Sequence, residues 1–321
     1  MPEVGRALLL AASLALAGAV RLAVADEPAT PPAARPGDMP NVIVEGQEPQ
    51  YVVPTQRDRI GRIWAPVYIN GQGPFRLAFD TGASRSGVTA ALAAKLGLTP
   101  DDRHPLRLRG VTGTRRVPTV RAERFQVGDL LLEPLTLPVL ADALGGAEGI
   151  LGTDGLGERR VRIEFRRDRI VIARSHNERA EPGFITLPLE RARGQLLVAN
   201  ARVGNVPVKV IIGTGGQATI GNNALRDALA RRAGEQPSLD RIVDVTLEEQ
   251  TGEGRLAPTI ALGELRIRGA RVTYGDMHLF EYLRMVDRPT LLLGMDTLGL
   301  LDTLIIDYRR HELQAKLVGG R

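Results

Sequence analysis

The chain has 321 residues, of which 43% are hydrophobic and 25% charged, a composition typical of a globular protein long enough for two domains. It contains no cysteine, which excludes disulfides, thiolate zinc sites and cysteine nucleophiles. The formal net charge is +5, but arginine is dispersed among Asp and Glu, so we expect no nucleic-acid partner. We also expect no metal and no cofactor, because the four histidines are far apart in sequence and form no H-E-x-x-H pattern.

The N-terminus predicts a targeting segment. Residues 7–20 are apolar, and Ala23 and Ala25 then form an A-x-A cleavage pattern. The apolar stretch is short for a membrane span. We therefore predict a signal peptide over residues 1–25, a secreted or periplasmic mature protein and no stable membrane insertion, with an uncleaved anchor as the alternative. The segment 26–55, which begins Pro-rich, is predicted to be an extended lead-in.

Most later segments predict short strands of an all-β fold. They alternate or run apolar over a few residues between Gly, Pro or Asp turns, and no pattern of a parallel sheet with long helices develops. The strand-like segments lie at 62–69, 75–79, 123–139, 169–173, 195–203, 208–212, 257–274 and 304–308. Two segments, 89–98 and 222–232, are helix-like instead.

The sequence repeats itself. Residues 73–89 are similar to residues 205–221, with Pro74 matching Pro207 and Thr81 matching Thr214. Two later pairs of landmarks recur in the same order: 149–157 with 292–301, and 162–172 with 305–317. Because several landmarks share one order and similar spacing, we infer two tandem copies of one small β domain.

The first copy of the repeated loop carries a specific motif. The run F-D-T-G-A-S at 79–84 follows an apolar strand, and I-L-G at 150–152 comes after it. This combination resembles the aspartic peptidases, and the tandem arrangement is similar to a bacterial single chain with two retropepsin-like lobes. The resemblance implies a bilobal acid-protease fold made of two β-barrel lobes with short helices. The implied division is a first lobe at 56–174, a linker at 175–186 and a second lobe at 187–321.

The resemblance also implies roles for the loop residues. In this family each lobe supplies one Asp, and the two carboxylates share a proton, one acting as general base on a water and the other as general acid. Asp80 would be the catalytic carboxylate of the first lobe. Thr81 would hydrogen-bond across to the opposite lobe, Gly82 would let the loop backbones approach, and Ser84 would hydrogen-bond Asp80. The implied substrate is a peptide or unfolded protein, hydrolysed without a covalent intermediate.

A substrate-covering hairpin, or flap, is expected between the loop and the I-L-G segment. Residues 106–125 are the best candidate, and 247–260 would be the matching hairpin of the second lobe. The expected tip of the first flap comprises Val111, Thr112, Gly113 and Thr114. An ordinary hairpin turn is the alternative interpretation of this tip.

The second copy departs from the family at one position. Gly213 stands where the second Asp is expected, while Thr214 and Gly215 are retained. Three hypotheses follow: an inactive relative that binds peptides or a protein partner, a homodimer in which two chains each contribute Asp80, or weak hydrolysis by Asp80 and water in one chain. Losing a positioned acid or base typically costs about 10²–10⁴ in rate.

The residues of both loops and the repeated carboxylates also have other interpretations. Gly213, Gly215 and Ala218 fit the G-x-G-x-x-A pattern of a dinucleotide-binding loop, although no βαβ unit follows. Asp80 could instead cap the helix-like segment that follows it. The repeated carboxylates of Asp154 and Asp296 are interpreted as helix-starting residues rather than catalysts.

Overall fold

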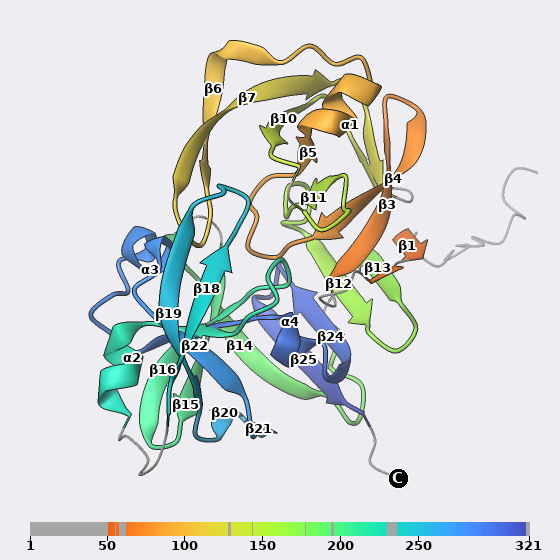
Figure 1. Ribbon diagram of the computed structural model, residues 1–321. Coiled ribbons are helices and arrows are strands. Elements are labelled where there is room, and N and C mark those ends of the chain that lie inside the picture. The colour runs from red at the N-terminus through yellow and green to blue at the C-terminus, as the bar shows by residue number, and fades with distance from the viewer. Residues whose placement is uncertain are drawn as a thin grey trace, which may run out of the picture. The chain divides into compact units, whose positions relative to one another are not determined.

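Alternating apolar side chains build two sheets. In β3 (Ile63–Ile69) every second residue is buried, from Ile63 to Ile69, which is the period-two pattern of a strand with one face on a core. The computed structural model (Figure 1) describes residues 51–54, 56–57, 62–127, 130–142, 144–176, 178–193, 196–229 and 236–318. The predicted signal peptide and most of the lead-in lie outside the described residues.

The first sheet has ten strands among the described residues, in the order β6-β7-β10-β5-β11-β4-β3-β8-β9 with β2 paired to β3. Besides β3, these are β2 (Gln56–Arg57), β4 (Gln72–Phe79), β5 (Gly87–Thr89), β6 (Asp101–Arg109), β7 (Thr114–Ala122), β8 (Phe125–Val127), β9 (Leu130–Leu132), β10 (Leu135–Leu140) and β11 (Gly149–Leu151). The all-β fold class is confirmed.

The second sheet has fifteen described strands, in the order β1-β13-β12-β24-β25-β14-β15-β16-β23-β17-β22-β19-β18, with β20 and β21 beside β15. They are β1 (Tyr51–Pro54), β12 (Arg159–Glu164), β13 (Arg169–Arg174), β14 (Ile185–Arg191), β15 (Leu197–Val203), β16 (Val206–Ile212), β17 (Ile220–Gly221), β18 (Ser238–Val243), β19 (Glu249–Leu256), β20 (Ile260–Leu262), β21 (Leu265–Ile267), β22 (Arg271–Tyr274), β23 (Thr290–Leu293), β24 (Leu301–Asp307) and β25 (Glu312–Leu317).

Within the described ranges, four short helices accompany the sheets: α1 (Ala90–Lys95), α2 (Asn223–Ala228), α3 (His278–Leu283) and α4 (Met295–Leu298). The side chain of Thr89 caps α1 by accepting a hydrogen bond from Leu92 N, and Asn222 caps α2 in the same way. Since Thr89 caps α1, Asp80 is not its capping residue. Among the described helices, none has the length and apolar character that a membrane crossing requires.

The two copies of the repeat pair their last hairpins with each other. Strand β12 of the first copy is antiparallel to β24 of the second, with Val161 opposite Ile306 and Ile163 opposite Leu304. Residues Gln47–Arg321 form one compact unit. The expected division into lobes at 56–174 and 187–321 therefore stays a prediction, because β12 and β13 belong to the larger sheet.

Candidate active site

Two loops meet where the copies face each other. The first follows β4 and begins at Asp80; the second follows β16 and begins at Gly213. Thr81 Oγ1 donates to the carbonyl of Ile212 at 2.7 Å, and Thr214 Oγ1 donates to the carbonyl of Phe79 at 3.0 Å. The backbone N–H of Thr81 also donates to Thr214 Oγ1 at 3.0 Å. Both threonines are buried, so this reciprocal set of hydrogen bonds joins the two loops away from water.

Gly213 occupies the position equivalent to Asp80. The backbone N–H of Asp80 donates to the carbonyl of Leu151 at 3.0 Å, and that of Gly213 donates to the carbonyl of Leu293 at 3.0 Å. The parallel neighbours match too, since β11 lies beside β4 and β23 beside β16. The second loop thus keeps the backbone of the first loop and lacks its carboxylate.

The Asp80 carboxyl group lies against the glycines of both loops. Gly82 N donates to Asp80 Oδ1 at 2.7 Å. A Cβ atom added at Gly215 would lie 2.2 Å from Asp80 Oδ2, which is far closer than any non-bonded contact. Glycine is therefore required here for the loop to approach the carboxyl group. Because the Asp80 carboxyl group already fills the space against Gly215, no room is left there for a phosphate, which argues against the dinucleotide-loop interpretation.

The environment of Asp80 shifts its pKa. Burial raises the pKa of Asp80, while hydrogen bonds from Gly82, the charge of Arg62 and further backbone N–H groups lower it and only partly offset the burial. The residue as a whole has intermediate exposure. Without a second carboxylate at position 213, desolvation rather than like-charge repulsion is what raises the pKa of this group.

Two residues that the sequence did not single out are coupled electrostatically to Asp80. Arg62 is 8% exposed and its Nη2 donates to the carbonyl of Leu144 at 2.5 Å. Tyr308 is 6% exposed, and its hydroxyl has no hydrogen-bond partner among the described residues. Burial and the charge of Asp80 both raise the pKa of Tyr308. In the sequence repeat, the position equivalent to Tyr308 is Phe165 in the first copy, so an aromatic residue recurs at this place.

The serine of the first loop has a different place from the one expected. Ser84 is exposed, and no hydrogen bond joins it to Asp80 among the described residues. The buried serine is Ser86, whose Oγ donates to Asp154 Oδ1 at 2.6 Å and accepts from Gly152 N at 3.0 Å. The sequence therefore pointed to the wrong serine.

The second copy repeats this network. Thr219 Oγ1 donates to Asp296 Oδ1 at 2.6 Å and accepts from Gly294 N at 3.2 Å. Asp296 lies in the first turn of α4, as expected. The corresponding expectation for Asp154 is wrong, since it starts no helix. In both copies the carboxylate accepts a hydrogen bond from a loop hydroxyl group, and the same hydroxyl accepts one from the backbone N–H of the glycine that follows β11 or β23.

Two hairpins extend beside these loops (Figure 1). The first, formed by β6 and β7, has its tip at residues 110–113, which nearly coincides with the expected tip of Val111, Thr112, Gly113 and Thr114. The second, formed by β18 and β19, has its tip at residues 244–248. The expected range of 247–260 was wrong, because it covered only the second strand.

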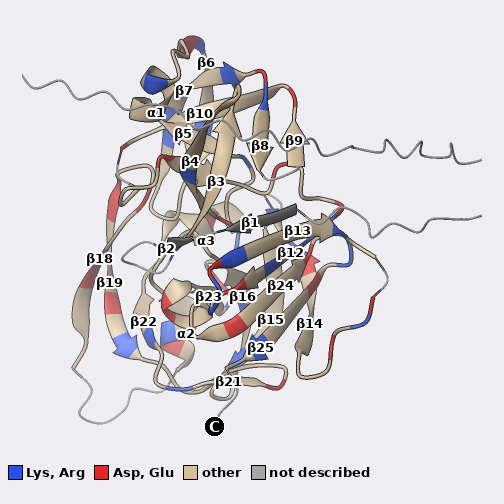
Figure 2. Cartoon of the chain, turned by 90° about the vertical axis from the view of Figure 1, so that its right-hand side faces the viewer, with Lys and Arg blue, Asp and Glu red and all other residues tan. Residues whose placement is uncertain are grey.

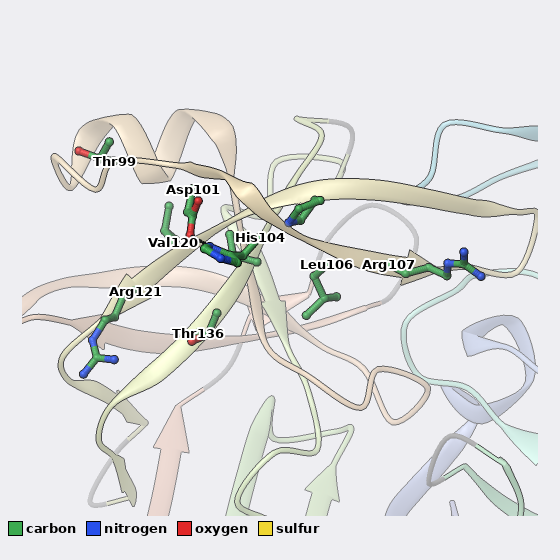
Figure 3. Close-up of a pocket in the computed structure, with 10 residues that line it drawn as sticks. Thr99, Asp101, His104, Leu106, Arg107, Val120, Arg121 and Thr136 are labelled. Carbon is green, nitrogen blue, oxygen red and sulfur yellow. Dashed lines mark hydrogen bonds and ion pairs between the residues drawn. The ribbon is translucent and has the colours of Figure 1, made fainter.

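A separate hollow of about 590 Å³ lies on the first hairpin (Figure 3). Its lining includes His104, which pairs with Asp101 at 2.8 Å, and the guanidinium-bearing residues Arg107 and Arg121. The hollow coincides with a register shift between Asp101 and Leu106 in the β6–β7 ladder. None of its lining residues belongs to the Asp80 or Gly213 loop, so this hollow is not part of the candidate active site.

Within the described part of the chain, no group of three or more His, Asp or Glu side chains is arranged to hold a metal ion. The position facing Asp80 is filled by the chain's own second loop, through Gly215 and Thr214. A homodimer that paired two Asp80 residues would first have to break the hydrogen bonds between these loops.

Comparison with known proteins agrees with the geometry of the first copy. Residues 65–154 match the family model of aspartyl proteases. This range contains the Asp80 loop, the first hairpin and the I-L-G strand β11. No curated protein matches the chain.

Proposed function

We propose that this protein is an aspartic-type peptidase in which Asp80 is the reacting carboxylate and an extended peptide is the substrate. The observation that carries the proposal is the paired-loop geometry around Asp80, with Thr81 and Thr214 hydrogen-bonded across the two copies. The match of residues 65–154 to the aspartyl protease family supports the same reaction class.

The proposed chemistry uses Asp80 twice. As a carboxylate it accepts a proton from water, whose oxygen forms a bond to the peptide carbonyl carbon. As a carboxylic acid it then returns that proton to the leaving nitrogen while the C–N bond breaks. No second acid stands at Gly213 to neutralise the developing oxyanion, so we expect a rate about 10²–10⁴-fold below that of a complete pair.

The absence of a carboxylate at Gly213 favours a second candidate function. In that hypothesis the same site around Asp80 binds a peptide or a protein partner without cleaving it. The two functions share a binding site and differ only in turnover. They are therefore separated by measuring binding and product formation on the same samples.

The direct test is Asp80→Asn, assayed beside the wild type on an unfolded protein between about pH 3 and pH 7, the range around carboxylate pKa values. We expect the substitution to abolish product formation and to leave peptide affinity within a few-fold. Peptide release that persists in the variant would contradict the role of Asp80. Binding without any wild-type turnover would favour the second candidate.

Restoring the missing carboxylate gives a gain-of-function test. A Cβ at Gly213 would lie 2.7 Å from Leu292 Cδ1. In Gly213→Asp alone, the new side chain would therefore clash with the end of the Leu292 side chain. The residue equivalent to Leu292 in the first copy is Ile150, which tolerates Asp80. We therefore expect Gly213→Asp with Leu292→Ile to raise peptidase activity by about 10²-fold or more, with Leu292→Ile alone as the control. Unchanged turnover in a folded double variant would count against this account.

A further inference from the structure

Two guanidinium groups stack on one tyrosine ring of the second copy. The guanidinium carbons of Arg109, at the end of β6, and of Arg193, which follows β14, each lie 4.8 Å from the centre of the Tyr282 ring in α3. Arg193 Nη1 also donates to the backbone carbonyl of Tyr282 at 3.3 Å. Both arginines are exposed and the tyrosine is half-buried. These three residues, the tyrosine stack, hold two positive charges at the protein surface.

The tyrosine stack has no carboxylate to neutralise it. Neither of its arginines forms an ion pair with Asp or Glu among the residues that the structure describes. The Phe184 ring also has two cations close to it, Arg162 at 5.5 Å and Lys316 at 5.7 Å. There, however, Arg162 pairs with Glu164 at 2.9 Å and with Glu181 at 2.8 Å. The uncompensated charge is therefore a feature of the tyrosine stack and not of every such ring.

The acidic residues of the strands β18 and β19 (Figure 2) pair with other cations. The pairs are Asp240 with Arg271, Glu249 with Arg241, and Glu253 with Arg255. These carboxylates are therefore not available to the tyrosine stack. An anion that binds there has to come from outside the chain.

More positive charge lies along the same strand as Arg109. Residues two apart lie on one face of a strand, so Arg107 and Arg109 share a face of β6. Arg107 stands directly opposite Arg116 of β7, and like charges in this position repel each other. Neither Arg107 nor Arg116 has an ion-pair partner within the described ranges. A bound anion would relieve this repulsion as well.

The tyrosine stack stands on an apolar cluster that borders both loops of the candidate active site. Tyr282 packs on the cluster that contains Leu196 and Leu292. A Cβ added at Gly82 would lie 4.0 Å from Leu196 Cδ2, and one added at Gly213 would lie 2.7 Å from Leu292 Cδ1. An extended peptide advances about 3.3 Å per residue, so side chains a few residues from a bond held at Asp80 reach the stack.

A carboxylate is the group that fits this arrangement. A guanidinium that lies with its face on a ring keeps the N–H groups of its edge for hydrogen bonds in its own plane. Carboxylates accept such hydrogen bonds in pairs, and these are among the stronger ones in proteins. Because the ring orients the arginines before a ligand arrives, less conformational entropy is lost on binding.

We propose that the tyrosine stack is a subsite for Asp or Glu side chains of the peptide, so that this protein selects acidic peptides. The inference rests on the proposed function, which supplies the peptide. The affinity of the stack for a carboxylate does not depend on turnover. The two claims are therefore tested by separate measurements.

The subsite is tested first with a ligand that is too small to be a substrate. N-acetylglutamate α-amide, whose only carboxylate is its side chain, is added to ¹⁵N-labelled protein at about pH 6, where that carboxylate is ionised. We expect the Nε–H signals of Arg109 and Arg193, assigned from Arg109→Gln and Arg193→Gln, to shift. The glutamine analogue should leave them in place. No shift, or equal shifts with both compounds, overturns the subsite and leaves the proposed function standing.

The peptide preference is tested by fluorescence anisotropy with labelled extended peptides capped at both ends. Two sets share one sequence and differ only in carrying Glu or Gln at each position in turn. We expect the wild type to bind the best Glu peptide at least about tenfold more tightly than its Gln counterpart, as for a hydrogen bond to a charged group. Arg193→Gln and Arg109→Gln should each reduce this preference several-fold.

The matched control is Arg268→Gln, which removes the same charge from another exposed arginine. Arg268 follows β21, at the end of the second copy away from the first hairpin (Figure 1). The control should keep the wild-type preference. An equal loss in Arg268→Gln would show that only the net charge attracts the peptide, and would overturn the subsite. If no peptide of either set binds, the proposed function is contradicted instead.

The pH dependence of the preference gives an independent check. Arginine stays charged throughout the acid range, whereas a Glu side chain is protonated below about pH 4.3. We expect the Glu and Gln peptides to bind within about twofold of each other at pH 3. A tenfold preference that persists at pH 3 would contradict recognition of a carboxylate.

Discussion

At the scale of single residues, Asp80 combines burial with hydrogen bonds that act on its pKa in opposite directions. Burial is the largest influence and raises the pKa, and Gly82 and Arg62 lower it. A complete aspartic pair keeps a proton through like-charge repulsion. Here a single carboxyl group has its pKa raised by desolvation instead.

This raised pKa predicts a pH-dependent stability effect of Asp80→Asn. The folded chain binds the Asp80 proton more tightly than the unfolded chain, whose value is near the ordinary 3.8. Native stability from this group is present below that value and is lost as pH rises through the raised folded pKa. We therefore expect Asp80→Asn to raise the melting temperature at pH 7 and to have little effect at pH 3. A melting temperature lowered at pH 7, or raised equally at both pH values, would contradict this.

The sequence located some site residues and could not locate others. Asp80, Thr81 and Gly215 stand in a local motif with a repeat, so their positions could be predicted. Arg62 and Tyr308 could not be assigned, because they reach Asp80 only through folding. Choosing Ser84 over Ser86 also failed, since the direction of each serine depends on how the loop bends between β4 and β5.

At the scale of elements, the loop after β4 and the loop after β16 are each hydrogen-bonded, through one hydroxyl and one carboxylate, to the segment that follows β11 or β23. Ser86 is fully buried and joins Asp154 to Gly152 N, while Thr219 does the same for Asp296. Such groups are costly to leave unpaired. The recurrence of these hydrogen bonds in both copies indicates that they support the loop, since only one copy has a carboxyl group at the position of Asp80.

Ser86→Ala should therefore destabilise the fold by about 1–3 kcal/mol, because it leaves buried polar groups without a partner. Ser84→Ala is the matched control two positions away, and as an exposed substitution it should change the free energy of unfolding by less than about 0.5 kcal/mol. Urea unfolding of the three proteins measures both values. A larger effect at Ser84 than at Ser86 would restore the role first predicted for Ser84.

The second hairpin shows why element boundaries were harder to predict. Its first strand, β18, reads Ser-Leu-Asp-Arg-Ile-Val and does not alternate polar and apolar residues, and Leu239 and Val243 are 77% and 55% exposed. A strand that projects from the core loses the buried face on which periodicity depends. The hairpin is held at its base by the pairing of β19 with β22 and at its tip by the hydrogen bond from Thr112 N to Asp244, and no local pattern encodes the contact at the tip.

At the scale of the whole molecule, the repeats are joined by their last hairpins as well as by the two loops. Periodicity within one copy predicts β12 and β24 as strands but does not say that they pair with each other. Their pairing puts Ile163 beside Leu304, both fully buried. The core cluster likewise contains residues of both copies, so the halves share one hydrophobic interior.

This shared interior predicts that the two copies unfold together. The only tryptophan is Trp64, which lies in the first sheet, whereas Leu304 lies in β24 of the second copy. Leu304→Ala should lower the free energy of unfolding by about 2–5 kcal/mol, as expected for a buried Leu. Trp64 fluorescence and far-UV circular dichroism should then shift by the same amount in urea, in a single transition. If Trp64 kept its wild-type midpoint while the circular dichroism shifted, the first sheet would be an independent folding unit, and the loops alone would have to hold the candidate active site together.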